Sequence, residues 1–348
     1  MLSGRRLAHS AWRGSRGWRC RWLDTASAAG DDERVDTQAV EAIRERAAAV
    51  RDGFNRALLD WWDAGHRDLP WRRTADPYAV LVSEVMLQQT QVERVAPKWR
   101  EFLDAFPTIA VLAAAPLAAV IRAWAGLGYN RRAVYLHQMA RATVTRYGGG
   151  LPADVAALRR LPGIGPYTAH AVAAIAFGLP VAAVDTNVRR VLMRVFDVEA
   201  ARPGTWAQAV ADVLVPAERP GDWNQALMEL GATVCTAVTP RCDICPVRHL
   251  CAAAPRIRAL RERDGRYRAP RMSRPQGRFS GSRRYYRGRI VDLLRHGDQG
   301  DGLTAAEIGA GLRLDFTADD LPWLHRLLTD LSRDGLVVWD GERARLPP

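Results

Sequence analysis

Four cysteines lie close together in the chain and could bind a metal centre jointly. They are Cys235, Cys242, Cys245 and Cys251, spaced C-x6-C-x2-C-x5-C. Four thiolates in one loop suit a four-coordinate centre, either a [4Fe–4S] cluster or a tetrahedral zinc ion. A zinc site usually has two CxxC pairs and this loop has one, which favours the cluster. Disulfide bonds are less favoured still, because no apolar signal segment marks the chain for secretion.

A glycine-containing turn and a later aspartate form a second candidate site. Residues 161–168 read LPGIGPYT between two segments with helical spacing. Gly163 and Gly165 permit a tight turn and expose N–H groups at the start of the next helix, where phosphate can bind. The plain alternative is an ordinary helix–helix turn. Asp185 precedes a further predicted helix and suits an N-cap, a role compatible with a rigid carboxylate beside a reacting sugar.

The composition indicates a basic globular protein with a polyanionic partner. The 348 residues carry a formal net charge of +12 and are 48% hydrophobic, which is enough for well-packed cores. No apolar run approaches the length of a membrane span, so we expect no membrane partner. Lys98 is the only lysine in the sequence, so a Schiff-base mechanism has almost no side-chain amine to use. The arginine excess also reflects a GC-rich codon usage, which weakens it as evidence for phosphate binding.

Most of the chain has the periodicity of α-helices, and no βαβ alternation or nucleotide-binding glycine loop is visible. Turns with proline or glycine separate the predicted segments. The expected helices are residues 40–64, 79–94, 98–106, 117–124, 131–147, 155–161, 167–177, 186–195, 205–214 and 223–234.

The two ends of the chain differ from this helical section. Residues 1–38, which include Cys20, form an expected disordered basic tail, and residues 255–286 form an expected basic linker. The last part, 287–348, predicts helices at 290–294, 308–312 and 321–334, the second after a capping box of Thr304 and Glu307. A hairpin of 336–339 and 343–346 follows. This order is typical of a winged helix, although other small α+β modules share it.

The combination of a helix–hairpin–helix, an aspartate and a four-cysteine loop resembles the helix–hairpin–helix DNA glycosylases. The strings LPWRRTADPYAVLVSEVMLQQTQVERV (69–95) and WAGLGYNRRAVYLH (124–137) resemble the adenine-specific mismatch glycosylases of the MutY type. The likeness covers about residues 50–251. It implies a mostly α fold, with a six-helix barrel module at 67–176 that contains the hairpin. An iron–sulfur cluster module at 39–66 and 177–254 would hold a [4Fe–4S] cluster on the four cysteines.

The resemblance also implies roles for single residues. Glu84 matches the acid that protonates adenine N7, and Asp185 matches the carboxylate that stabilises the sugar cation. Asn187 lies near that aspartate in the family. Tyr167 stands where bifunctional lyases carry a lysine, which implies a monofunctional enzyme. Gln89 and Tyr129 match residues that wedge into the duplex near 8-oxoguanine, and the residues that match the adenine pocket are Trp71, Arg72, Leu87 and Glu229.

The chemistry of base removal independently calls for two acids. Adenine leaves poorly as an anion, so a protonated acid is needed on the base side, and an ionised carboxylate is needed beside the oxocarbenium-like sugar. The target base must also leave the stack, which requires a pocket and wedging side chains. Without the resemblance, Glu84 would be a surface helix acid and Tyr129 a core aromatic residue. The apolar neighbours of Glu84 and the glycines before Tyr129 favour the functional roles.

Double-stranded DNA with A:8-oxoG or A:G mispairs is therefore the expected partner of a monomeric, cytoplasmic, nucleoid-associated bacterial enzyme. Two departures from the family stand out. Residues 252–348 are too short for the Nudix-like domain of many members, and Asp185-Thr186-Asn187 replaces the common Asp-Gly-Asn. Two other functions remain open: a thymine-mismatch or oxidised-pyrimidine glycosylase, and a non-enzymatic iron–sulfur DNA-binding regulator.

Overall fold

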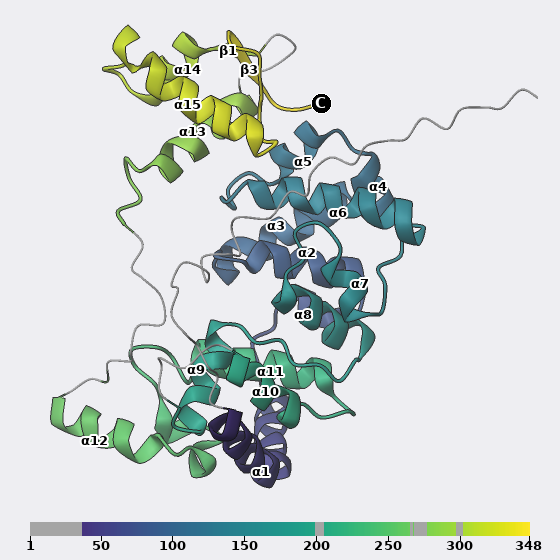
Figure 1. Ribbon diagram of the computed structural model, residues 1–348, viewed down its shortest axis with the longest axis vertical. Helices are drawn as coiled ribbons and strands as arrows, with labels where there is room; N and C mark the ends of the chain where they lie inside the picture. The colour runs from purple at the N-terminus through teal and green to yellow at the C-terminus, as the bar shows by residue number, and fades with distance from the viewer. Residues whose placement is uncertain (1–36, 199–204, 265–266, 268–276, 297–301) are drawn as a thin grey trace, which may run out of the picture. The chain divides into compact units, whose positions relative to one another are not determined.

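The computed structural model describes residues 37–198, 205–264, 267, 277–296 and 302–348. The predicted tail lies outside these residues up to residue 36, and the first helix already begins at Thr37. The described chain is mostly helical, as predicted (Figure 1). Its α-helices are α1 (Thr37–Ala64), α2 (Pro77–Leu87), α3 (Val92–Ala105), α4 (Ile109–Ala114), α5 (Leu117–Ala123), α6 (Arg131–Tyr147), α7 (Val155–Arg159), α8 (Pro166–Phe177), α9 (Thr186–Val195), α10 (Thr205–Leu214), α11 (Pro220–Thr233), α12 (Ala254–Asp264), α13 (Arg283–His296), α14 (Ala305–Leu312) and α15 (Leu321–Arg333).

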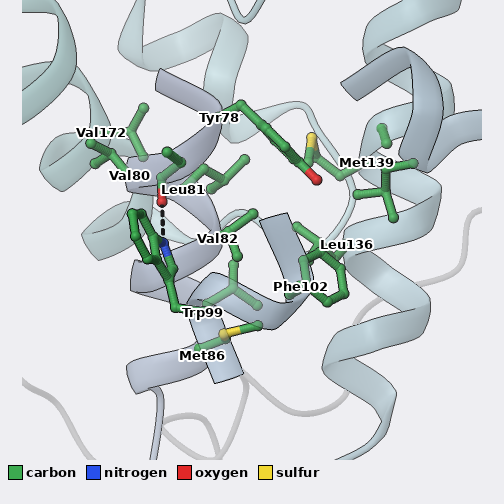
Figure 2. Packing of buried hydrophobic residues seen from close by; sticks show 14 of the residues in the cluster. Tyr78, Val80, Leu81, Val82, Met86, Trp99, Phe102, Leu136, Met139 and Val172 are labelled. Carbon is green, nitrogen blue, oxygen red and sulfur yellow. Dashed lines mark hydrogen bonds between the residues drawn. The ribbon is translucent and has the colours of Figure 1, made fainter. Parts of the chain in front are cut away.

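The first hydrophobic core surrounds α2, whose side chains are buried on nearly every side. Helix α2 packs against α3 and α8, and α6 packs against α4 and α5. Figure 2 shows the interior of this core, where Trp99 of α3 donates a hydrogen bond of 2.9 Å from Nε1 to the carbonyl of Ala79. Asp76 accepts from the first N–H groups of α2, and Pro77 occupies its first turn. A helix capped in this way and apolar all round must lie inside the protein, and it carries Glu84 there.

The second core joins α1 to helices that come much later in the chain. Phe54, Leu58 and Trp62 of α1 pack with residues of α9, α10 and α11. Asn55 fixes this arrangement, because its Nδ2 donates to the carbonyl of Leu214 at 2.8 Å and its Oδ1 accepts from Trp223 at 2.8 Å. Helix α11 of the second core also packs against α8 of the first, so it connects the two cores.

The third core belongs to the C-terminal module, which we define as the described residues from Arg283 to Pro348. It contains α13, α14, α15 and strands β1 (Leu303–Thr304), β2 (Val338–Trp339) and β3 (Arg343–Arg345). The strands are antiparallel in the order β1-β3-β2. The predicted capping box and hairpin are confirmed, and the winged helix stays a prediction.

Three expectations about the elements need correction. The helix predicted for residues 79–94 is broken at 88–91, where Gln89 has a φ of 59°. Helix α4 was not expected. The segment expected to be a linker at 255–286 begins within α12, whose Ile257 packs with Ala253 and Tyr267, and it ends in the first turn of α13. Within the described chain, every helix is too short or too polar to cross a lipid bilayer.

The predicted helix–hairpin–helix is formed by α7, α8 and the turn between them. Gly163 has a φ of +75°, and a Cβ placed there would lie 2.6 Å from Cβ of Tyr135 on α6. Gly165 is the N-cap of α8 and offers no capping side chain. The turn therefore needs a glycine at 163 for both its backbone conformation and its contact with α6.

We expect Gly163→Ala to destabilise the fold more than Gly178→Ala. Gly178 ends α8 at a φ of +65°, and no atom lies within 4 Å of the position that a Cβ would take, so alanine there meets only backbone strain of about 1 kcal/mol. Gly163→Ala adds the clash with Tyr135, for a total of about 2–4 kcal/mol. Urea midpoints of the two variants would test this difference, and equal losses would contradict it.

Candidate active site

Glu84 is a buried carboxyl in the third turn of α2, with 6% of its surface exposed. Burial raises its pKa to about 7, against the lowering effect of a hydrogen bond with Tyr167. The charge of Asp185 raises the pKa further, and that of Arg72 lowers it. A carboxyl of this kind is partly protonated at neutral pH and can serve as a general acid.

Tyr167 comes from the first turn of α8, just after the hairpin. Its hydroxyl donates to Sδ of Met228 at 2.9 Å and also shares a hydrogen bond with Glu84. Burial and the nearby carboxyl of Glu84 raise the pKa of Tyr167 well above its usual value, so the phenol stays protonated. Because the phenol has a single proton, it can donate to an ionised Glu84 only in place of Met228, and it can accept from a protonated Glu84 while it donates to Met228.

Asp185 lies close enough to Glu84 for their charges to interact, although a hundred residues separate them. It is the N-cap of α9: Oδ1 accepts from the backbone N–H of Val188 at 2.7 Å, and Oδ2 accepts from Nδ2 of Asn187 at 2.7 Å. The predicted cap is therefore confirmed. Both oxygens are held by hydrogen bonds to the same short segment, which fixes the orientation of the carboxylate.

Asn187 connects Asp185 to the cysteine loop. Its Oδ1 accepts from Nη2 of Arg190 at 2.9 Å, and Arg190 also donates to the carbonyls of Gly231 at 2.6 Å and Cys235 at 2.9 Å. A Cβ at position 231 would lie 2.8 Å from Cβ of Asn187, so glycine lets α11 approach the start of α9. The sequence Asp185-Thr186-Asn187, which departs from the common Asp-Gly-Asn, is compatible with this site because Thr186 is exposed.

Glu229 of α11 accepts hydrogen bonds from two arginines that follow α1. Arg67 binds both carboxylate oxygens at 2.7 Å each, and Nη2 of Arg72 binds Oε2 at 2.8 Å. Burial alone would raise the pKa of Glu229, but these bonds outweigh it and lower the pKa. The guanidinium of Arg72 also lies 4.8 Å from the ring centroid of Trp62. Sequence reasoning missed Arg67, whose partner is 162 residues away and which no motif signals.

Trp71 and Leu87, the other two predicted pocket residues, lie at the edge of the first core. Trp71 is 6% exposed and makes an edge contact with Trp99, at 6.3 Å between ring centroids. Leu87 is half-buried at the end of α2, one turn beyond Glu84. Trp71 therefore has a packing role besides any contact with a ligand.

Gln89 and Tyr129 stand on two loops with unusual backbone conformations. Gln89 belongs to the Gln89 loop (residues 88–91), and Tyr129, with a φ of 44° and 48% exposure, belongs to the Tyr129 loop (residues 125–130). Non-glycine residues with positive φ are uncommon and often mark functional sites. The structure thus places Tyr129 at the surface, as expected, and not in the core.

Arg132 connects these two loops by hydrogen bonds to both. Sequence reasoning also missed this residue. Its Nη1 donates to the carbonyl of Gln88 at 2.6 Å, and its Nη2 donates to the carbonyls of Leu127 and Gly128 at 3.1 Å each. The side chain is buried, which lowers its pKa to about 10. The guanidinium lies 5.6 Å from the ring centroid of Tyr129. These acceptors lie in two separate segments of the sequence, so only the folded structure brings them together.

The four half-buried cysteines lie near one another in the loop after α11. The charges of the other three all act on Cys245, and Arg194 donates to Sγ of Cys235 at 3.2 Å. No three His, Cys, Asp or Glu side chains in the described residues surround a position for a single ion. Four separate cysteine sulfurs with a neighbouring guanidinium fit a [4Fe–4S] cluster, in which each sulfur binds its own iron.

Comparisons with known proteins agree with this arrangement. Residues 82–214 match the model of the HhH-GPD superfamily base excision DNA repair proteins, and residues 235–251 match the iron–sulfur binding domain of endonuclease III. An adenine DNA glycosylase of Mycolicibacterium smegmatis is 42% identical over 289 residues, which cover 80% of this chain and 91% of that protein. The chain belongs to the adenine DNA glycosylases.

Further relatives extend this finding. The human adenine DNA glycosylase is 46% identical over 225 residues, 61% of this chain and 41% of that protein. A thermostable thymine-DNA glycosylase of known structure has a TM-score of 0.55 at 31% identity, covering 59% of this chain and 97% of that one. The chain is therefore a base-excision repair DNA glycosylase with the helix–hairpin–helix fold and an iron–sulfur binding domain at residues 235–251.

Burial of Glu84 should make the stability of this adenine DNA glycosylase depend on pH. The pKa of about 7 in the folded protein lies above the usual value of 4.5, so the contribution of Glu84 is most favourable below pH 4.5 and is lost as pH rises through 7. Glu84→Gln, which cannot ionise, should therefore gain stability over the wild type as pH rises, approaching about 3 kcal/mol at pH 8.5. Urea unfolding of both proteins at pH 5, 7 and 8.5 measures this difference, and a gain that is constant with pH would contradict it.

Proposed function

We propose that this enzyme hydrolyses the N-glycosidic bond of adenine mispaired with 8-oxoguanine or guanine, without lyase activity. The observation that carries the proposal is the pairing of buried Glu84, with a pKa of about 7, and Asp185, whose two oxygens are held by hydrogen bonds. One acid can be protonated while the other is ionised. This pair meets the requirement for expelling a neutral purine from a sugar that becomes cationic.

In the proposed reaction, Glu84 gives its proton to N7 of the extruded adenine. The bond between C1′ and N9 then breaks, and its electron pair leaves with the base. Asp185 stabilises the positive charge on the sugar until water adds to C1′ and releases a proton. Tyr167 and Asn187 act by orientation: Tyr167 shares a hydrogen bond with Glu84, and Asn187 donates to Asp185 at 2.7 Å.

The DNA is held and opened by the surrounding elements in this proposal. Gly163 and Gly165 present the start of α8 to a phosphate, and Gln89 and Tyr129 wedge into the duplex beside the opposite base. Adenine selection is assigned to Trp71, Arg72, Leu87 and Glu229, of which Arg72 lies close enough to Glu84 for their charges to interact. In this proposal, the catalytic core itself recognises 8-oxoguanine. The cytoplasmic, nucleoid-associated location and the monomeric state stay predictions.

The iron–sulfur cluster has a structural role in this proposal. Cys235, Cys242, Cys245 and Cys251 would hold it, and the bound cluster supplies cross-links within the loop. Arg241 and Arg248 of this loop are exposed and would contact phosphate. The cluster takes no part in the proposed proton transfers.

Glu84→Gln and Asp185→Asn should each bind mispaired DNA but release adenine at least about 10³-fold more slowly than the wild type. Both variants keep the size of the side chain, and asparagine can still cap α9. Single-turnover release of free base from A:8-oxoG, A:G, G:T and thymine-glycol duplexes measures the effect and the specificity together. Thymine release would favour the alternative pyrimidine glycosylase, whereas binding of all duplexes with no abasic product would favour a DNA-binding regulator.

Borohydride added during turnover should trap no covalent enzyme–DNA adduct. Tyr167 occupies the place of a lyase lysine, and Lys98, the only lysine, pairs with Glu101 on α3 at 2.6 Å. Strand breaks should therefore appear only after alkali. A trapped adduct, resolved by gel electrophoresis, would show that an amine attacks C1′ and would contradict a monofunctional mechanism.

A further inference from the structure

The C-terminal module contacts α5 and the start of α6, beside the Tyr129 loop, through one buried arginine. Arg295, near the end of α13, has a side chain that is 4% exposed. Its Nε donates to the carbonyl of Ile121 at 3.0 Å, its Nη2 donates to Oδ1 of Asn130 at 2.9 Å, and Nη1 pairs with Asp292. A buried guanidinium is costly unless its donors are used, so Arg295 depends on all three partners.

Asn130 is the last residue of the Tyr129 loop and directly follows Tyr129. It stands at the N-cap of α6, where an asparagine side chain commonly accepts from the helix N–H groups. Here it makes no such bond and accepts from Arg295 instead. The contact with the C-terminal module therefore replaces the local cap at this helix start.

Further contacts fix the same end of α6. Arg131 pairs with Asp334 at 3.2 Å, and Asp334 also pairs with Arg287 of α13. Val134 and Ile121 are buried in the third core, among side chains of the C-terminal module. The terminal carbonyl of Pro348 accepts from the N–H of Leu117 in α5 at 3.2 Å. The module thus binds the helices on both sides of the Tyr129 loop.

The conformation of this loop calls for such support. Tyr129 is exposed and has a positive φ, and it follows Gly126 and Gly128, which also have positive φ. Glycines make this segment flexible in isolation. Arg132 holds the carbonyls of residues 127 and 128, but its contact with the carbonyl of Tyr129 is long, at 3.4 Å. Arg295 of the C-terminal module binds the side chain of the next residue, Asn130.

We propose that Arg295 is a positioning residue through which the C-terminal module holds Tyr129 ready to enter the duplex. This inference rests on the proposed function, in which Tyr129 wedges beside the opposite base. A pre-formed loop avoids the entropy of ordering a glycine-rich segment on each encounter with DNA, and small misplacements of contacting groups lower rates strongly. The module thereby contributes to recognition of the opposite base without touching that base.

A double-mutant cycle tests the proposal in the full-length protein with its cluster. Arg295→Met removes the donors and keeps much of the length of the side chain, and we expect adenine release from A:8-oxoG to slow about tenfold, with a smaller effect on A:G. In a Tyr129→Ala background, Arg295→Met should slow release no further, because both act through the same side chain. Arg289→Met, at an exposed position of α13, controls for loss of one positive charge and should match the wild type.

Each other outcome is decisive. If Tyr129→Ala lowers the rate but Arg295→Met does not, the inference is wrong and the proposed role of Tyr129 stands. Equal losses from Arg295→Met in both backgrounds would also overturn it, because they indicate general destabilisation. If Tyr129→Ala has no effect, the wedge role itself fails. Should Arg295→Met not fold, Asn130→Ala removes the same hydrogen bond from the half-exposed loop side and is judged by the same cycle.

Discussion

The burial of the Glu84 carboxyl beside the carboxyl of Asp185 is the constraint on which the rest of this structure depends. Glu84 can reach a pKa of about 7 only because α2 carries it into the interior of the first core. Asp185 approaches it from the start of α9, which belongs to the second core. The two cores must therefore meet with a fixed geometry, and α11, which packs against both α8 and α9, holds them there.

Buried arginines supply much of this fixed geometry. Arg72, Arg132 and Arg190 each donate to groups that are far apart in the sequence, and most of these acceptors are backbone carbonyls. A guanidinium has five donors in a rigid plane and can join several loops at once, which a lysine cannot do. The net charge from the many arginines indicates little more than a polyanionic partner. Individual buried arginines, however, have a structural role in this protein.

The sequence was sufficient for the class of fold and for the residues that lie in dense motifs. Glu84, Asp185 and the cysteines stand in strings with distinctive order, and their proximity follows from the fold those strings imply. Their individual roles stay predictions. Arg67 and Arg132 were missed because their acceptors are Glu229 and the carbonyls of distant loops, which no local pattern signals. The break at Gln89 was missed because no glycine or proline marks it, and β1 was missed because two residues are too few to alternate.

The second core has a consequence for the order in which this chain can fold. Asn55 of α1 contacts Leu214 and Trp223, 159 and 168 residues further along the chain. During synthesis, α1 leaves the ribosome with Phe54, Leu58 and Trp62 still lacking their partners, while the whole first core emerges and can fold behind it. The apolar face of α1 thus stays without its partners until α9, α10 and α11 have been synthesised, and this nascent helix is a segment that a chaperone could protect.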